Sequence, residues 1–137
     1  MLDQAQIEIT RKKFLNPLLF RLFLIKILPM GFLSGMRISQ LDDSTCEVHL
    51  KYKWLIKNPF RSTFWAVLGM AAEMTTGALL VSYTRSQTPN VSFILTENEA
   101  QYYKKGRDRM RFVCNHSAQV RKTVEQAMED GEKHHLK

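Results

Sequence analysis

Residues 64–83 form the most apolar stretch of the chain, FWAVLGMAAEMTTGALLVSY, and they contain a single ionisable carboxylate, Glu73. A helix with this composition is apolar on every side, which indicates deep burial or a membrane span. Burying an unpaired carboxylate is costly, so Glu73 needs a specific reason to stand there. The stretch therefore predicts a membrane span, a core helix, or a helix that builds a site.

The membrane alternative has some support, because Arg61 and Arg85 flank the stretch and small residues recur within it. Against it stand alternating patterns on both sides and a mean hydropathy of -0.26 for the whole chain. The polar beginning, MLDQAQIEIT, also lacks the pattern of a secretory signal. We expect a core helix in a cytoplasmic protein without a membrane span.

The chain has the size of one domain, with 137 residues and a formal net charge of +7. An excess of positive charge favours an anionic partner, which could be a nucleic acid, an acidic lipid surface or a phosphate-bearing small molecule. Cys46 and Cys114 are too few for a disulfide framework. Both follow the apolar side of alternating segments, which predicts small core residues in a reducing compartment.

Local signals in the first half predict a helix followed by a hairpin. Asn16 and Pro17 are a capping residue and a favoured first helical residue, and the helix should run to about Leu28. From residue 36, in MRISQLDDSTCEVHLKYKW, apolar and polar residues alternate with a period of two. The alternation lies on both sides of the turn residues 42–44 and predicts two strands. The inward face of the second strand is then Cys46, Val48, Leu50 and Tyr52.

The second half predicts the long helix, two strands and a last helix. Ser62 is the candidate N-cap of a helix over about 62–84. Residues 91–105 should form a long strand, a turn at Gly106 should follow, and residues 107–116 should return as the next strand. Ser117 then begins a helix that Gly131 ends. This order predicts an α+β fold with an antiparallel sheet.

Four segments together resemble the hotdog-fold thioesterase superfamily, and most of all a branch of uncharacterised bacterial thioesterase-like proteins. They are NPFRS at 58–62, AAE at 71–73, VSFILTENEAQYYKK at 91–105 and RMRFVC at 109–114. The resemblance covers about residues 15–130. It implies one hotdog domain over 1–137, in which an antiparallel sheet wraps the long helix. It also implies an acyl-CoA or acyl-carrier thioester as substrate, and a homodimer or a dimer of dimers.

Many of these thioesterases carry H-N-x-x-G-x-x-H-G-G and an acid seven residues after the last glycine. On this sequence the Asn falls on Asn58 and the acid on Glu73, with the spacing kept. The resemblance implies that Glu73 is the base or nucleophile and that Asn58 orients the reactants. It also implies that the backbone N–H groups of Trp65 and Ala66 hold the oxyanion. The remaining motif positions depart from the pattern, with Lys57, Arg61, Phe64, Trp65 and Ala66, so bulkier groups crowd the approach.

Other interpretations stay open for the two matching residues. Glu73 can serve as a structural carboxylate that accepts hydrogen bonds from Thr76 or a neighbouring chain, and Asn58 before Pro59 is a common turn residue. Eight helical residues separate Trp65 from Glu73, which is about 12 Å of rise. That is too far for both residues to act on one carbonyl within one subunit. The resemblance implies the solution, since hotdog proteins dimerise and build each site across the subunit boundary.

Basic residues crowd the region before and within the last predicted strand. They are Lys104, Lys105, Arg107, Arg109 and Arg111, opposed by Asp108. This run is either a solvated surface or, as the resemblance implies, a site for the phosphates of coenzyme A. The candidate ligand-binding residues are Arg61, Ser62, Phe64, Lys104, Lys105 and Arg107. No metal-ligand spacing accompanies His116, His134 and His135, and we expect neither a metal nor a separate cofactor.

These observations lead to two main hypotheses for function. The first is an acyl-CoA thioesterase, and the second is a non-catalytic hotdog protein that binds a fatty acyl group or another apolar ligand. Nucleic-acid binding ranks third. Tyr102 and Tyr103 beside the basic strand could stack on bases, but no nucleic-acid recognition motif accompanies them. The resemblance also implies a further strand after the last helix. Since the chain ends at Lys137, either that strand is shortened or residues 133–137 and a partner complete the sheet.

Overall fold

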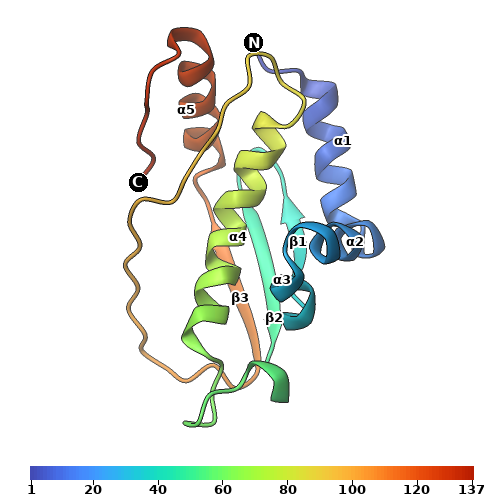
Figure 1. Cartoon of the computed structure of the whole chain (residues 1–137), viewed down its shortest axis with the longest axis vertical. Coiled ribbons are helices and arrows are strands. Elements are labelled where there is room, and N and C mark those ends of the chain that lie inside the picture. The colour runs from blue at the N-terminus through green and yellow to red at the C-terminus, as the bar shows by residue number, and fades with distance from the viewer.

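The computed structural model describes all 137 residues, and the protein has an α+β fold. A three-stranded antiparallel sheet, in the order β1-β2-β3, packs against one long helix, with further helices around them (Figure 1). The elements in chain order are α1 (Gln4–Leu15), α2 (Pro17–Ile27), α3 (Pro29–Ser34), β1 (Arg37–Leu41), β2 (Cys46–Lys51), the 3-10 turn η1 (Trp54–Ile56), α4 (Trp65–Thr84), β3 (Arg109–Cys114) and α5 (Ser117–Asp130).

The N-terminal region contains more helix than the sequence predicted. The predicted helix is α2, and the Asn16 side chain caps it by accepting the N–H groups of Leu18 and Leu19. Pro29 does not simply end this helix, because it also begins the short helix α3. Helix α1 was not predicted, although Asp3 caps it in the same way.

The hairpin of β1 and β2 follows the prediction. Its turn is held by the Asp42 carboxylate, which accepts the backbone N–H groups of Ser44 at 2.8 Å and Thr45 at 2.9 Å. Cys46, Val48 and Leu50 alternate into the core as expected. The strands pair in antiparallel register, with a bulge between Ile38 and Gln40.

Helix α4 begins three residues later than the predicted cap, so the assignment of Ser62 as N-cap is wrong. Phe64 occupies the N-cap position, and its side chain makes no capping hydrogen bond. The residues before it are held extended by other partners: Thr63 pairs with Lys57 as an isolated bridge, and the Asn58 N–H donates to the Ser62 carbonyl at 2.8 Å. These contacts delay the start of the helix.

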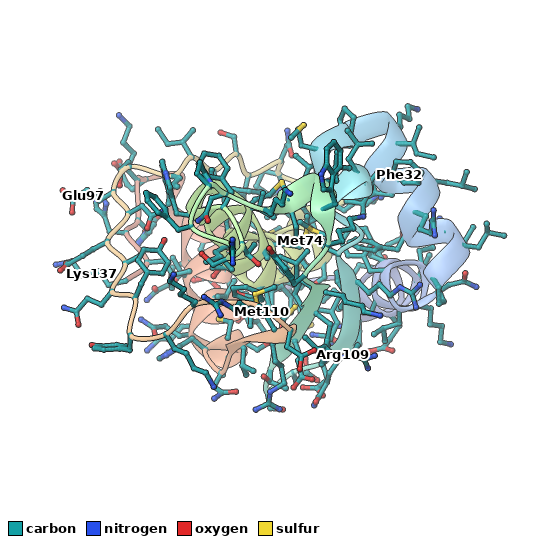
Figure 2. All side chains as sticks on the ribbon, turned by 90° about the horizontal axis from the view of Figure 1, so that it is seen from below. Phe32, Met74, Glu97, Arg109, Met110 and Lys137 are labelled. Carbon is teal, nitrogen blue, oxygen red and sulfur yellow. The ribbon has the colours of Figure 1, made fainter.

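Over most of its length helix α4 is buried on one face only, which corrects the prediction of a helix buried on all sides. Burial is more complete only at its C-terminal end, residues 82–84. Its residues Val67, Ala71, Thr75, Ala78 and Leu79 are buried, and Met74 packs against the same core as Met110 of the sheet; both are labelled in Figure 2. The opposite face carries small residues around Glu73 and is open. By length and composition alone α4 could cross a membrane, but its buried face belongs to the core shared with the sheet.

The predicted strand at 91–105 is absent. These residues are extended and exposed, form no backbone hydrogen bonds, and pass α4 on the side away from α2 (Figure 1). A β-strand needs a neighbouring strand to pair with, and no strand of this chain lies alongside the segment. The basic return strand does form, as β3, and pairs with β2 from Cys46 opposite Cys114 to Lys51 opposite Arg109.

Helix α5 closes the fold by packing against α4. It begins at Ser117 as predicted and buries Val120 and Val124. Gly131 ends it with a φ of 68°, a left-handed conformation that glycine adopts without strain. Residues 131–137 form no strand.

Candidate functional site

The loop before α4 is organised by Asn58. Its carbonyl oxygen accepts the backbone N–H groups of Phe60 at 3.0 Å and Ser62 at 3.2 Å. Its amide nitrogen donates to the Ser62 hydroxyl at 3.1 Å and to the Thr63 carbonyl at 3.4 Å. Within this chain the amide therefore shapes the loop, as the turn interpretation of Asn58 predicts.

A second segment, just before β3, is tied to this loop. The Gly106 carbonyl accepts both the backbone N–H and the hydroxyl of Thr63, each at 2.8 Å. The Lys105 ammonium donates to the Phe60 carbonyl at 3.0 Å. Gly106 fits this contact because a Cβ there would press on the Met110 sulfur. These bonds hold the basic run beside the beginning of α4.

A cavity of about 330 Å³ lies between the two segments, and we call it the basic cavity. Five of the predicted site residues line it: Asn58, Ser62, Trp65, Lys104 and Lys105. Tyr102 and Tyr103 line it as well. Their approach could not be predicted from the sequence, because a long strand at 91–105 would have placed them in the sheet.

The first turn of α4 leaves backbone donors free next to this cavity. The N–H groups of Val67 and Leu68 bond to the Phe64 carbonyl, whereas those of Trp65 and Ala66 have no acceptor in the chain. A helix begins with such free donors and with the positive end of its dipole. Such a helix start favours a negatively charged or strongly polarised oxygen.

A smaller cavity of about 140 Å³ lies on the other side of the same turn, and we call it the apolar cavity. Met30 and Leu33 of α3 and Leu55 of η1 line it, together with Phe64 and Val67. Consecutive residues thus face different cavities, since Phe64 lines the apolar cavity and Trp65 the basic cavity. The sequence contained no signal for this cavity, because the predicted helix ended at about Leu28 and no helix was predicted at α3.

Glu73 is not brought to either cavity. It is exposed on the open face of α4 and forms no hydrogen bond or ion pair within the chain. This exposure explains how an apolar helix tolerates a carboxylate without a partner in the single chain. Arg61 and Arg107 are also exposed and line neither cavity, and Arg61 has a left-handed φ of 60°.

A buried polar cluster at the far end of α4 was missed by the sequence analysis. Arg11 is only 4% exposed, and it donates to the Asp43 carboxylate at 2.9 Å and the Tyr83 hydroxyl at 2.8 Å. The Tyr83 hydroxyl also lies 2.9 Å from the Ser117 hydroxyl, which donates to the Asp42 carbonyl at 2.8 Å. Burial raises the pKa of the Tyr83 hydroxyl, so the cluster holds it neutral.

The cluster joins four elements and opens onto neither cavity, which marks it as structural. A signal for it was present in the sequence, because Ile7, Thr10, Arg11 and Phe14 recur at helical spacing and all are buried in α1. Nowhere in the chain do three or more His, Cys, Asp or Glu side chains come together in a way that could hold a metal ion.

The sheet packed on α4, with cavities on both sides of the helix start, defines an α+β domain with a candidate ligand site. The chain belongs to the family described as Domain of unknown function (DUF4442), whose match spans residues 18–135. No curated protein matches it.

Among solved structures, the fold is similar to that of a protein with unknown function from Chlorobaculum tepidum TLS. The TM-score is 0.67 at 18% sequence identity, and the match covers 86% of this chain and 76% of the other.

Proposed function

We propose that the protein is a hotdog-type domain that binds an acyl-CoA thioester and hydrolyses it. The observation that carries the proposal is the pair of cavities on the two sides of the α4 start, one basic and one apolar, with free N–H groups at Trp65 and Ala66. A thioester of coenzyme A has the same three parts: a polyanionic carrier, an apolar acyl chain and a polarisable carbonyl between them.

Each part of such a substrate has a chemical counterpart at the site. The ammonium groups of Lys104 and Lys105 attract phosphate charge, and Tyr102 offers an aromatic surface. The apolar cavity accepts the first carbons of an acyl chain. The N–H groups of Trp65 and Ala66 stabilise the negative charge that develops on the carbonyl oxygen. Asn58 acts as a positioning residue, because its amide fixes the loop that leads to these donors.

The base in this proposal is Glu73 of a second subunit. Within one chain the rise from Trp65 to Glu73 is about 12 Å, so its own carboxylate does not reach the carbonyl. When the open faces of two α4 helices approach, Glu73 of one subunit faces the helix start of the other. The carboxylate takes a proton from water, and the water oxygen bonds to the thioester carbon. The carbon–sulfur bond then breaks, and the carboxylic acid returns the proton to the leaving sulfur, which releases the thiol and the carboxylic acid product.

Free-thiol release from a panel of acyl-CoAs tests the proposal. The wild-type protein should turn over at least one member, and Glu73→Gln should lower kcat at least about a hundredfold with an unchanged circular dichroism spectrum. Glu97→Gln is the matched control, because Glu97 is an exposed carboxylate on segment 91–105, at the outer edge of the molecule (Figure 2). Absence of turnover with every acyl-CoA, or equal rates for Glu73→Gln and Glu97→Gln, contradicts the proposal.

The alternative is a protein that binds an acyl group without hydrolysing it. Two observations favour it: Glu73 lines neither cavity, and the large side chains of Phe64 and Trp65 stand at the helix start. This alternative predicts acyl-CoA binding without thiol release. It also predicts that Lys104→Gln with Lys105→Gln weakens binding, whereas Glu73→Gln leaves it unchanged. Lipid that co-purifies with the wild type, identified by mass spectrometry, would favour it as well.

A further inference from the structure

Helix α2 is apolar on its exposed side as well as on its buried side. Phe20 and Leu24 face the core, and both are almost fully buried. Leu18, Leu22 and Ile25 recur at i, i+4 and i+7 and are 67%, 54% and 49% exposed. A surface helix of a soluble domain usually presents polar side chains to water, so this face lacks a partner within the chain.

The exposed apolar side chains continue into the next elements. Helix α3 adds Met30 and Leu33, and η1 adds Leu55, all three exposed and all three at the mouth of the apolar cavity. Helices α2 and α3 lie on the same flank of the molecule, opposite α5 (Figure 1). We call this surface the apolar flank. Its residues are Leu18, Leu22, Ile25, Met30, Leu33 and Leu55.

Positive charge surrounds the apolar flank and negative charge is absent from its segments. Residues 9–41 and 48–72, which include α2, α3 and η1, contain no Asp or Glu, whereas the chain as a whole has 13. Lys12, Lys13 and Lys26 are exposed at the ends of α1 and α2. Near η1, the Lys57 ammonium lies 5.8 Å from the centre of the Trp54 ring, which is itself exposed.

We propose that the apolar flank docks on an anionic lipid bilayer, with α2 lying in the plane of the membrane interface. Helices that bind in this way insert exposed Leu and Ile side chains into the boundary between headgroups and acyl chains. Lys and Arg side chains around them then meet acidic headgroups, and each contributes to binding near the surface. The aromatic ring of Trp54 belongs to the side chains that favour this interface.

Charge decides between a bilayer and a second copy of the chain as the occupant. A symmetric dimer through the apolar flank would bring each subunit's Lys12, Lys13 and Lys26 towards the same basic surface of its partner. Residues 9–41 contain no carboxylate, and Glu8, one turn before Lys12, already pairs with Arg11 at 3.5 Å. An anionic bilayer instead supplies the opposite charge over the whole surface. The apolar flank shares Met30, Leu33 and Leu55 with the apolar cavity. The inference nevertheless does not rest on the proposed function, because Leu18, Leu22 and Ile25, which line neither cavity, carry its test.

Vesicle flotation with the full chain tests the inference. The wild type should float with vesicles of phosphatidylcholine that contain about a quarter phosphatidylglycerol, and should bind vesicles of phosphatidylcholine alone at least about tenfold less. The triple variant Leu18→Ser, Leu22→Ser and Ile25→Ser should lose at least about tenfold in binding to the anionic vesicles. These side chains are exposed, so the variant keeps the fold, and circular dichroism checks this.

Two matched controls separate this surface from general stickiness. Phe93→Ser, Ile94→Ser and Leu95→Ser remove three exposed apolar side chains from segment 91–105 and should leave vesicle binding unchanged. Changing Lys12, Lys13 and Lys26 to Gln should weaken binding. Changing Lys122, Lys133 and Lys137 to Gln should leave vesicle binding unchanged. These three exposed lysines lie in α5 and in the last residues.

Three results would overturn the inference. One is a wild type that does not float with either kind of vesicle. Another is equal binding losses for a surface variant and its control. The third is a dimer in sedimentation experiments without lipid that dissociates in the Leu18, Leu22 and Ile25 variant, because a second copy then covers the flank.

Discussion

The Arg11 guanidinium donates a hydrogen bond to the Tyr83 hydroxyl at 2.8 Å, which joins α1 to the last turns of α4 inside the core. Both side chains are buried, and the Arg11 guanidinium carbon lies 5.3 Å from the centre of the Tyr83 ring. The same hydroxyl contacts Ser117 at the beginning of α5. One phenol therefore connects three helices, and it shares the polar attachment of α1 with the Asp43 carboxylate, which also accepts a hydrogen bond from Arg11.

Removing this hydroxyl should destabilise the protein. Tyr83→Phe leaves the Arg11 guanidinium and the Ser117 hydroxyl each without one buried partner, which should lower the free energy of unfolding by about 1–3 kcal/mol. Urea denaturation followed by circular dichroism measures this. Tyr102→Phe is the matched control, because the Tyr102 side chain is exposed, and it should change stability by less than about 0.5 kcal/mol. Equal effects of the two substitutions would contradict the structural role of Tyr83.

The free energy of unfolding should fall as the pH is lowered, because two carboxylates of the hairpin turn have lowered pKa values in the folded protein. The hydrogen bond from Arg11 holds the pKa of Asp43 below its ordinary value of 3.8, and hydrogen bonds from Ser44 and Gln40 lower the pKa of Asp42 as well. The folded protein thus binds these protons less tightly than the unfolded chain does. The contribution is present above about pH 4 and is lost as the pH falls through the lower folded-state pKa values.

Urea denaturation between pH 6 and pH 2 measures how the free energy of unfolding falls at low pH. We call this fall the acid limb, and variants can assign it to a residue pair. Asp43→Asn should make the limb shallower, because the carboxylate that Arg11 stabilises is gone. Arg11→Met should also make it shallower, and the double variant should add nothing beyond the single ones, since both remove the same interaction. An unchanged limb in Asp43→Asn would show that other carboxylates dominate.

The two cysteines should differ in reactivity although they lie opposite one another in the β2–β3 pair. Cys46 is fully buried, and burial raises its pKa to about 12, whereas Cys114 is half-buried. At pH 8 the thiolate fraction of Cys46 is then about one part in 10,000. Iodoacetamide should modify Cys114 in the folded protein and leave Cys46 unmodified, as peptide mass spectrometry can show. In urea both should react, and similar rates in the folded state would contradict the burial of Cys46.

The sequence predicted the elements whose formation is decided by neighbouring residues. The Asn16 cap, the turn at 42–44 and the end of α5 at Gly131 all depend on contacts within a few positions. Ser62 looked equally suitable as a cap, but its hydroxyl accepts a hydrogen bond from the Asn58 amide, and Thr63 donates to the Gly106 carbonyl, so the chain is held extended there. Segment 91–105 has strand-forming residues and no partner strand, which local propensity cannot reveal.

The site was predictable to a similar extent. Motif spacing drew attention to Asn58 and to the start of α4, and Lys104 and Lys105 of the basic run line the cavity beside them, whereas Arg107 does not. The spacing could not predict which face of a helix carries a residue or which elements lie beside it. Glu73 is on the open face of α4, and the apolar cavity is formed by α3 and η1, elements that carry no motif.

Replacing two glycines in different environments by alanine should change the free energy of unfolding in opposite directions. Gly35 ends α3 with a φ of 76°, a conformation that costs a residue with a Cβ about 1–2 kcal/mol, so Gly35→Ala should lower the free energy of unfolding. Gly69 lies within α4 on its open side, where an added Cβ meets no atom within 4 Å. Gly69→Ala should raise the free energy of unfolding by about 0.5–1 kcal/mol, because alanine loses less conformational entropy in a helix. Urea midpoints of the two variants and the wild type decide the matter. The prediction applies to the single chain, so the urea titrations are run at a protein concentration at which sedimentation shows a monomer. A destabilising Gly69→Ala under those conditions would contradict the open environment of Gly69.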